Sequence, residues 1–205
     1  FRDVTLSALP PDEGRGLGVV AADFEGTGQL SILVANDMTP NHYHTNVRIQ
    51  PDGTPVFEEN GLLSGLAVDE FGRSQASMGI ALGDADQDGL LDCLVTNFYG
   101  ESNAFYHQQS AGAFADVATA TGIRMASLDV LGFGTQFIDA DLDGWPDLFV
   151  ANGHVDDYTH EGQPFQMQPQ LFRNLGDLQF VLEPAVRIGE YFDGKWLGRS
   201  AALID

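Results

Sequence analysis

An aspartate-rich loop recurs along the chain about every sixty residues, and this repeat constrains the fold more than any other feature of the sequence. The leading aspartates are Asp23, Asp84, Asp139 and Asp205, separated by 61, 55 and 66 residues. Glycine or serine stands seven and five positions before each of them, and asparagine stands thirteen positions after the first three. Self-similarity at a fixed period is the signature of a repeat architecture. The chain is therefore predicted to be an array of similar units.

Each unit predicts four short strands. The first is rich in small residues and runs into the aspartate loop, as in MGIALG at 78–83. The second is the β-rich run after the loop: LSILVAN, LDCLVTN or PDLFVAN. The last two strands centre on aromatic residues, namely Tyr43, Phe105 and Phe172 in the third strand and Phe57, Phe114 and Phe180 in the fourth. No helical periodicity of useful length is present.

Four strands per unit, repeated radially, is the arrangement of a β-propeller. We therefore predict an all-β fold in which residues 1–205 form one incomplete propeller of about three and a half blades, breaking off at the first residue of a fourth loop, Asp205. Small residues in the first strand suit a place near the central axis, where neighbouring blades leave little room. The third unit carries an insertion, roughly 155–165, which is expected to form a loop on one face.

The second and third loops, DADQDGLLD and DADLDGWPD, carry carboxylates that alternate along a tight turn. The side chains are Asp84, Asp86, Asp88 and Asp92 in the second loop and Asp139, Asp141, Asp143 and Asp147 in the third. Alternating carboxylates converge on one point, and a hard cation such as Ca²⁺ makes that favourable. Two like charges about 4 Å apart repel by roughly 4 kcal/mol at an effective dielectric near 20. Both loops are therefore predicted to bind calcium.

An EF-hand is the first alternative, because D-x-D-x-D-G matches the start of its loop. The twelfth position, however, holds Val95 or Val150 instead of the bidentate glutamate. The last acidic residue comes at position nine, and a strand is predicted to follow rather than a helix. The pattern therefore indicates a calcium loop within a β-hairpin.

The first loop, DFEGTGQLS, keeps Asp23 and replaces the later carboxylates. The corresponding positions hold Glu25, Thr27, Gln29 and Ser31. We favour an ordinary turn with an acidic rim here, and a weaker calcium site is the alternative.

The charge balance excludes two classes of partner. The chain has 30 acidic against 9 basic residues, a formal net charge of −21. Such a surface repels phosphate backbones and anionic membranes, so nucleic-acid and lipid-surface roles are not expected. No run approaches the roughly 18 apolar residues of a membrane span, so direct membrane insertion is not expected either. The one cysteine, Cys93, excludes an internal disulfide and is predicted to be a core residue.

The loops with their flanking strands, GDADQDGLLDCLVTN and IDADLDGWPDLFVANGH, resemble the FG-GAP (VCBS-type) repeats of integrin α-chain propellers. FRDVT, SMGIALGDADQDG, LFVANGHV, QLFRN and LGRSAALID are similar to phrases of the cartilage acidic protein and ASPIC/UnbV branch. This resemblance implies a seven-bladed propeller, calcium in the blade loops and an exported setting. Carried over by position, it adds the backbone carbonyls of Leu90 and Trp145 to the metal ligands. Seven units of this length need on the order of 420 residues, so we expect a partial sequence or part of a split propeller.

Two groups of histidines are further candidates. In the insertion, His154 and His160 bracket Asp156 and Asp157, and loops on a rigid scaffold often carry binding, so this loop is a candidate contact surface. His42 and His44 lie two residues apart near a turn. We expect them to be solvated, and a transition-metal site is the alternative.

No G-x-S-x-G, H-E-x-x-H or phosphate-binding Gly-Lys motif occurs, so we do not predict an enzyme. The favoured function is a calcium-rigidified scaffold outside the cytoplasm that binds protein or glycan, with the rest of the propeller or neighbouring subunits as further partners. The alternative is an exported propeller enzyme, a lyase or hydrolase, because propeller folds host both.

Overall fold

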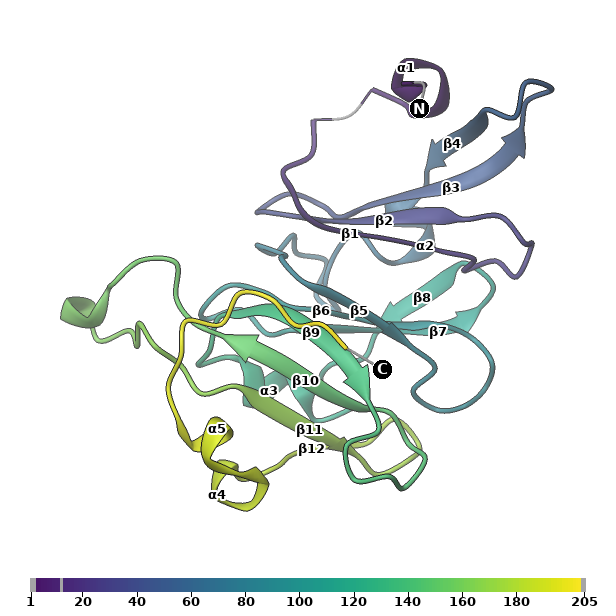
Figure 1. Cartoon of the computed structure of the whole chain (residues 1–205). Helices are drawn as coiled ribbons and strands as arrows, with labels where there is room; N and C mark the ends of the chain where they lie inside the picture. Colours follow the sequence, from purple (N-terminus) through teal and green to yellow (C-terminus); the bar gives the residue numbers. More distant parts are fainter. Residues whose placement is uncertain (1–2, 12, 204–205) are drawn as a thin grey trace.

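In the computed structural model, which describes residues 3–11 and 13–203, the chain forms three four-stranded antiparallel sheets (Figure 1). The first comprises β1 (Gly16–Ala22), β2 (Ser31–Asn36), β3 (His42–Ile49) and β4 (Pro55–Glu59). The second comprises β5 (Ile80–Gly83), β6 (Asp92–Val95), β7 (Ala104–Ser110) and β8 (Ala113–Asp116). The third comprises β9 (Gly132–Ile138), β10 (Asp147–Asn152), β11 (Gln170–Asn174) and β12 (Phe180–Leu182).

The predicted all-β class is confirmed, and every predicted aromatic centre lies in its strand. The helical segments are single turns: α1 (Thr5–Ala8), α2 (Gly61–Ser64), α3 (Ile123–Ser127), η1 (Thr159–Glu161), α4 (Ala185–Ile188) and α5 (Glu190–Asp193). Among the described residues, no helix is long and apolar enough to cross a membrane. Asp205, the leading aspartate of the predicted fourth loop, lies outside the described residues.

Within each sheet the strands follow chain order, and the first strand forms one edge. These edge strands face one another, because β1 contacts β5 and β5 contacts β9. The sheets therefore fan out from their first strands, an arrangement consistent with consecutive blades of a propeller (Figure 1). The described part of the chain contains no closed sheet.

The small residues of the first strands are required by backbone contact between neighbouring sheets. A Cβ atom added to Gly18 would lie 2.2 Å from the carbonyl oxygen of Met78 in the next unit. At Gly79 it would lie 1.9 Å from the carbonyl oxygen of Phe133. The predicted crowding at the first strands is therefore confirmed.

The recurring asparagines and the recurring small residues hydrogen-bond to each other across sheets. The carbonyl oxygen of each asparagine accepts a backbone N–H from the small residue that opens the next unit. The pairs are Ser77 to Asn36 (3.0 Å), Gly132 to Asn97 (3.1 Å) and Gly198 to Asn152 (2.9 Å). The recurring asparagines and the recurring small residues are therefore the acceptors and donors of one hydrogen bond that repeats between units.

Residues 197–201 continue this series beyond β9, although they are not assigned as a strand. A Cβ atom added to Gly134 on β9 would lie 2.3 Å from the backbone nitrogen of Ala201. The carboxyl-terminal segment, yellow in Figure 1, runs beside β9 much as β9 runs beside β5. Residues 197–201 therefore take the place that their sequence register predicts.

Two apolar layers fill the spaces between sheets. The layer between the first and second sheets includes Leu33, Tyr43, Cys93, Val95 and Tyr106. The layer between the second and third includes Leu94, Phe105, Leu148, Val150 and Phe172. Strand β6 supplies both layers, and all four of its residues are buried. Its sequence is therefore apolar after Asp92 rather than alternating.

Cys93 is fully buried in the first layer, as predicted, and burial raises the pKa of its thiol well above the usual range. The reactive species of cysteine is the thiolate. We therefore expect Cys93 to resist a disulfide reagent in the native protein and to react fully in denaturant. Rapid labelling of the native protein would contradict the packing of the first two sheets.

The insertion forms a closed loop on the third sheet. The backbone N–H of His154 donates to the carbonyl oxygen of Phe165 at 2.8 Å, and Gly153 and Gln166 form an isolated bridge beside it. The loop contains η1 and projects away from the sheets, at the left of Figure 1.

Candidate metal centre

The three aspartate loops join the first and second strands of their sheets and share one hydrogen-bonding pattern. Both carboxylate oxygens of the leading aspartate accept backbone N–H groups from residues four and five positions later. The donors are Thr27 and Gly28 for Asp23 (2.8 and 2.6 Å), Asp88 and Gly89 for Asp84 (both 3.0 Å), and Asp143 and Gly144 for Asp139 (3.0 and 3.1 Å). These bonds hold each loop in a tight turn.

The fourth and sixth residues of every loop have a left-handed backbone. The sixth is always glycine, with φ of 79° at Gly28, 90° at Gly89 and 96° at Gly144. The fourth is Gly26 in the first loop, whereas Gln87 and Leu142 adopt φ of 60° and 61° in the others. Left-handed backbone costs a non-glycine residue roughly 1–2 kcal/mol. The two acidic loops therefore keep a strained residue where the first loop has glycine.

Three carboxylates converge in each of the acidic loops. Asp84, Asp86 and Asp88 each offer an oxygen within 4.8 Å of the others, and so do Asp139, Asp141 and Asp143. Oxygens bound to one calcium ion at about 2.3–2.6 Å lie at most about 5 Å apart. Both triads therefore have the spacing and the all-oxygen chemistry of a shared calcium ion. The first loop forms no such group within the described residues.

The carboxylates at position nine, Asp92 and Asp147, are not members of these triads. Both are only 1% exposed and accept backbone N–H groups from the loop and from the third strand. The donors are Ala85 and Gln108 for Asp92 (3.0 and 2.9 Å), and Ala140 and Asn174 for Asp147 (3.0 and 2.8 Å). Burial raises the pKa of both carboxyl groups, and these hydrogen bonds oppose the shift.

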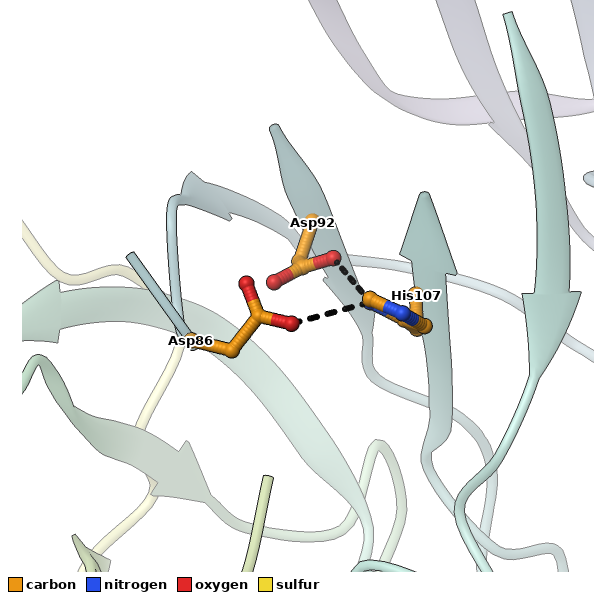
Figure 2. Close-up of side chains that lie close together, drawn as sticks. All are labelled: Asp86, Asp92 and His107. Atoms are coloured by element: carbon orange, nitrogen blue, oxygen red, sulfur yellow. Dashed lines mark hydrogen bonds and ion pairs between the residues drawn. The ribbon is translucent and has the colours of Figure 1, made fainter. Parts of the chain in front are cut away.

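An imidazole stands beside the second loop. Nδ1 of His107, on β7, lies 3.0 Å from Oδ1 of Asp92 and 3.9 Å from Oδ2 of Asp86 (Figure 2). The three side chains form a second group whose ligand atoms all lie within 4.8 Å of one another. The side chains of Asp86 and His107 are 21% and 19% exposed, so this group is reached from solvent.

Arg173 occupies the corresponding place beside the third loop. On β11, Arg173 comes one residue after Phe172, which pairs with Leu148. On β7, His107 comes one residue after Tyr106, which pairs with Cys93. Nε of Arg173 donates to Glu183 at 2.8 Å. This hydrogen bond raises the pKa of Arg173. The negative charges of Glu183 and of the third-loop carboxylates raise it further. The third loop therefore has the permanently charged guanidinium of Arg173 where the second loop has the imidazole of His107.

The first loop uses its remaining carboxylate within the sheet. Glu25 accepts hydrogen bonds from the hydroxyl of Tyr43 and, at 2.8 Å, from the hydroxyl of Ser31. Tyr43 is buried, and burial together with the contact to Glu25 raises its pKa above the usual range. Glu25 is thus engaged away from Asp23 and Thr27, which favours a turn over a weaker calcium site. Gln29 donates its backbone N–H to Thr27.

A side-chain hydrogen bond joins the second loop to the third. Nε2 of Gln87 donates to the carbonyl oxygen of Gly144 at 2.8 Å. The two acidic triads therefore belong to neighbouring loops on one rim of the sheets.

Leu90 and Trp145, which the family resemblance adds as carbonyl ligands, follow the position-six glycines. Their backbone N–H groups donate to Oδ1 of Asp88 at 2.8 Å and Oδ1 of Asp143 at 2.9 Å. The indole of Trp145 lies against Gly176, where an added Cβ atom would be 3.4 Å from the ring. Trp145 therefore packs its loop against the turn between β11 and β12.

The four residues predicted for the contact loop fall into two environments. His154 is fully buried, and its Nδ1 accepts the backbone N–H of Asp156 at 3.3 Å. The rings of Tyr158, Phe98 and Tyr99 surround it at centroid distances of 5.0, 5.3 and 6.1 Å. Asp156, Asp157 and His160 are exposed. His154 therefore anchors the insertion, and the other three are available for contact.

His42 and His44 both lie on β3, with ring centroids 5.8 Å apart. They border an open cavity of about 530 Å³ between the first sheet and the amino-terminal segment. His44 is only 4% exposed, so the expectation that both histidines are solvated is wrong for His44. His42 and His44 are two residues apart on β3 and therefore share one face of the strand, where His42 is partly buried.

His107, Arg173 and Gln87 are not among the site residues that the sequence predicts. Each acts across strands or between loops, so the spacing within one loop does not indicate it. Extending the predicted strand register would have found His107, because it lies two residues beyond Phe105, the predicted centre of the third strand.

A comparison with curated proteins gives no match. Residues 84–150 match the model of an FG-GAP-like repeat. The matched span begins at the leading aspartate of the second loop and ends within β10, so it includes both acidic triads. The chain therefore contains an FG-GAP-like repeat built around its second and third aspartate loops.

Proposed function

We propose that the chain is a calcium-binding scaffold of the β-propeller type, which works outside the cytoplasm and binds protein or glycan. The observation that carries the proposal is the pair of carboxylate triads on neighbouring loops of an FG-GAP-like repeat. The side chains at positions one, three and five of the second and third loops would hold the ion. Asp92 and Asp147 would orient these loops through their backbone hydrogen bonds.

Charge explains why a cation would rigidify this rim. Each triad gathers three carboxylates, and pairwise repulsion at about 4 Å amounts to roughly 1 kcal/mol in water and 4 kcal/mol at a dielectric near 20. A divalent ion would replace that repulsion with attraction. The bond from Gln87 to Gly144 would let each ordered loop support the other.

The proposed location rests on the family resemblance, which implies an exported setting. Calcium modules that work outside cells typically bind at about 10⁻⁴ to 10⁻³ M. Sites of that strength fill where calcium is millimolar and stay empty at cytosolic concentrations. Within the FG-GAP repeats, we assign the chain to the cartilage acidic protein and ASPIC/UnbV branch and propose a seven-bladed ring. We propose binding rather than catalysis, with exposed loops such as that of Asp156, Asp157 and His160 as contact surface.

Trp145 supplies a test of calcium binding in the third loop. Tb³⁺ takes the oxygen ligands of Ca²⁺ and emits when a nearby indole is excited. We expect tryptophan-sensitised Tb³⁺ emission that excess Ca²⁺ removes and that both Trp145→Phe and Asp143→Ala abolish.

The other tryptophan, Trp196, bonds to the Tyr191 carbonyl and is the internal comparison. Trp196→Phe should leave the emission unchanged, and so should Thr27→Ala in the first loop. Emission that survives Asp143→Ala, or that calcium does not displace, would overturn the proposal for this loop.

A further inference from the structure

The second loop carries a nitrogen donor that the calcium proposal does not use. His107 shares Asp86 and Asp92 as close neighbours, and the three side chains converge from the loop, β6 and β7 (Figure 2). Calcium takes oxygen ligands, whereas imidazole suits zinc and other first-row transition metals. The donor set of this group, two carboxylates and one imidazole, therefore has a chemistry different from that of the triads.

The spacing of the group matches a transition ion. A metal bound at about 2.1 Å in tetrahedral geometry separates neighbouring ligand atoms by roughly 3.4 Å. Nδ1 of His107 lies 3.0 Å from Asp92 and 3.9 Å from Asp86, on either side of that value. Small movements of the partly exposed Asp86 side chain would complete the geometry.

The group is also held in place before any ion binds. Asp92 is 1% exposed and fixed by backbone N–H groups of Ala85 and Gln108. His107 precedes Gln108 on β7, whose register with β6 is set by strand pairing. Asp86 is the partly exposed member, with 21% of its side chain accessible to solvent. A fixed Asp92 with two partly exposed partners would allow an ion to enter without unfolding the sheet.

We propose that Asp86, Asp92 and His107 form a site for a divalent transition metal of the zinc, cobalt or manganese class. The site is particular to the second loop. At the same place beside the third loop, Arg173 offers five donors and no acceptor, so it cannot bind a metal. Because Asp86 belongs to both groups, a transition metal in this site and calcium in the second triad compete for one carboxylate.

Cobalt is the probe, because its visible absorption changes when nitrogen and carboxylate oxygens bind it. We expect Co²⁺ to give a saturable visible spectrum with one ion per chain, and Zn²⁺ to bleach it. His107→Arg, which reproduces the third-loop arrangement, should weaken Co²⁺ binding at least tenfold. His160→Gln, at an exposed histidine of the insertion, is the matched control and should leave it unchanged.

A shift of the His107 imidazole resonances on addition of Zn²⁺ to the unaltered protein tests the same contact without any substitution. Unshifted resonances, or a Co²⁺ affinity within twofold of the original in folded His107→Arg, would mean that His107 only hydrogen-bonds Asp92. This proposal and calcium binding can fail separately. Tb³⁺ emission from the third loop without cobalt binding would leave the calcium scaffold standing, and cobalt binding without that emission would leave only the transition-metal site.

Discussion

Gly79→Ala is expected to lower the free energy of unfolding by at least about 3 kcal/mol. The new Cβ atom would lie 1.9 Å from the carbonyl oxygen of Phe133 and 3.0 Å from Oγ1 of Thr96. The Thr96 hydroxyl accepts the N–H of Gly79 at 2.8 Å and donates to the Phe133 carbonyl at 2.7 Å. One methyl group would therefore separate the second and third sheets and strain this link. Denaturant unfolding of the two proteins measures the effect.

Gly72→Ala is the matched control for that substitution. Gly72 has a left-handed φ of 74°, but an added Cβ atom would meet nothing within 4 Å. Gly72→Ala should therefore lower the free energy of unfolding only by the cost of a left-handed backbone at alanine, roughly 1–2 kcal/mol. Equal losses in the two variants would show that the first strands do not pack backbone to backbone.

Calcium is expected to stabilise the chain by about 2–4 kcal/mol when both acidic loops are filled. Ligand that binds only the folded state contributes RT ln(1 + [L]/Kd). At about 5 mM calcium and a Kd of roughly 10⁻⁴ to 10⁻³ M, each loop gains about 1–2 kcal/mol. For a chain of this size the melting temperature should rise by roughly 4–16 °C. Thermal unfolding in calcium and in chelator measures this difference.

Magnesium is the matched control for that experiment. Mg²⁺ demands near-octahedral geometry at about 2.0–2.1 Å and gives up its water reluctantly. It should therefore stabilise much less than calcium at the same concentration. Superimposable melting curves in calcium, magnesium and chelator would contradict metal binding by the triads.

The strand order of the fold could be predicted because each signal was local to one repeat. An aromatic centre, a glycine-rich first strand or an apolar second strand each occupies a few consecutive residues. The contact between Asn97 and Gly132 cannot be predicted from the period, although both residues are marks of the repeat. This contact joins two different units. The repeat period shows where a residue type recurs in the sequence, but it does not show which residue it contacts.

The candidate site was predicted in the same partial way. The spacing of Asp84, Asp86 and Asp88 indicated the triad, because alternate positions of one turn converge. Asp92, at position nine of the same pattern, remains a predicted ligand; the sequence did not indicate that it starts β6 and accepts backbone N–H groups from Ala85 and Gln108. His107 was absent from the prediction because its distance from Asp92 depends on strand register.

The hydrogen bonds of Glu25 also could not be predicted from the sequence. Its contact with Tyr43 joins residues eighteen positions apart, within a sheet whose pairing had first to form. In the loop alone, glutamate at position three is simply a longer carboxylate. In the folded chain Glu25 accepts a hydrogen bond from the buried Tyr43, and this contact distinguishes the first loop from the other two.

The number of calcium ions bound per chain tests the central claim most directly. Isothermal titration should count two ions, and Asp88→Ala and Asp143→Ala should each remove one, because each deletes a member of a triad. Thr27→Ala should leave the count at two, because the first loop forms no such group among the described residues. A count of zero would contradict the calcium scaffold itself. A count of three that falls to two on Thr27→Ala would contradict the distinction between the first loop and the acidic pair.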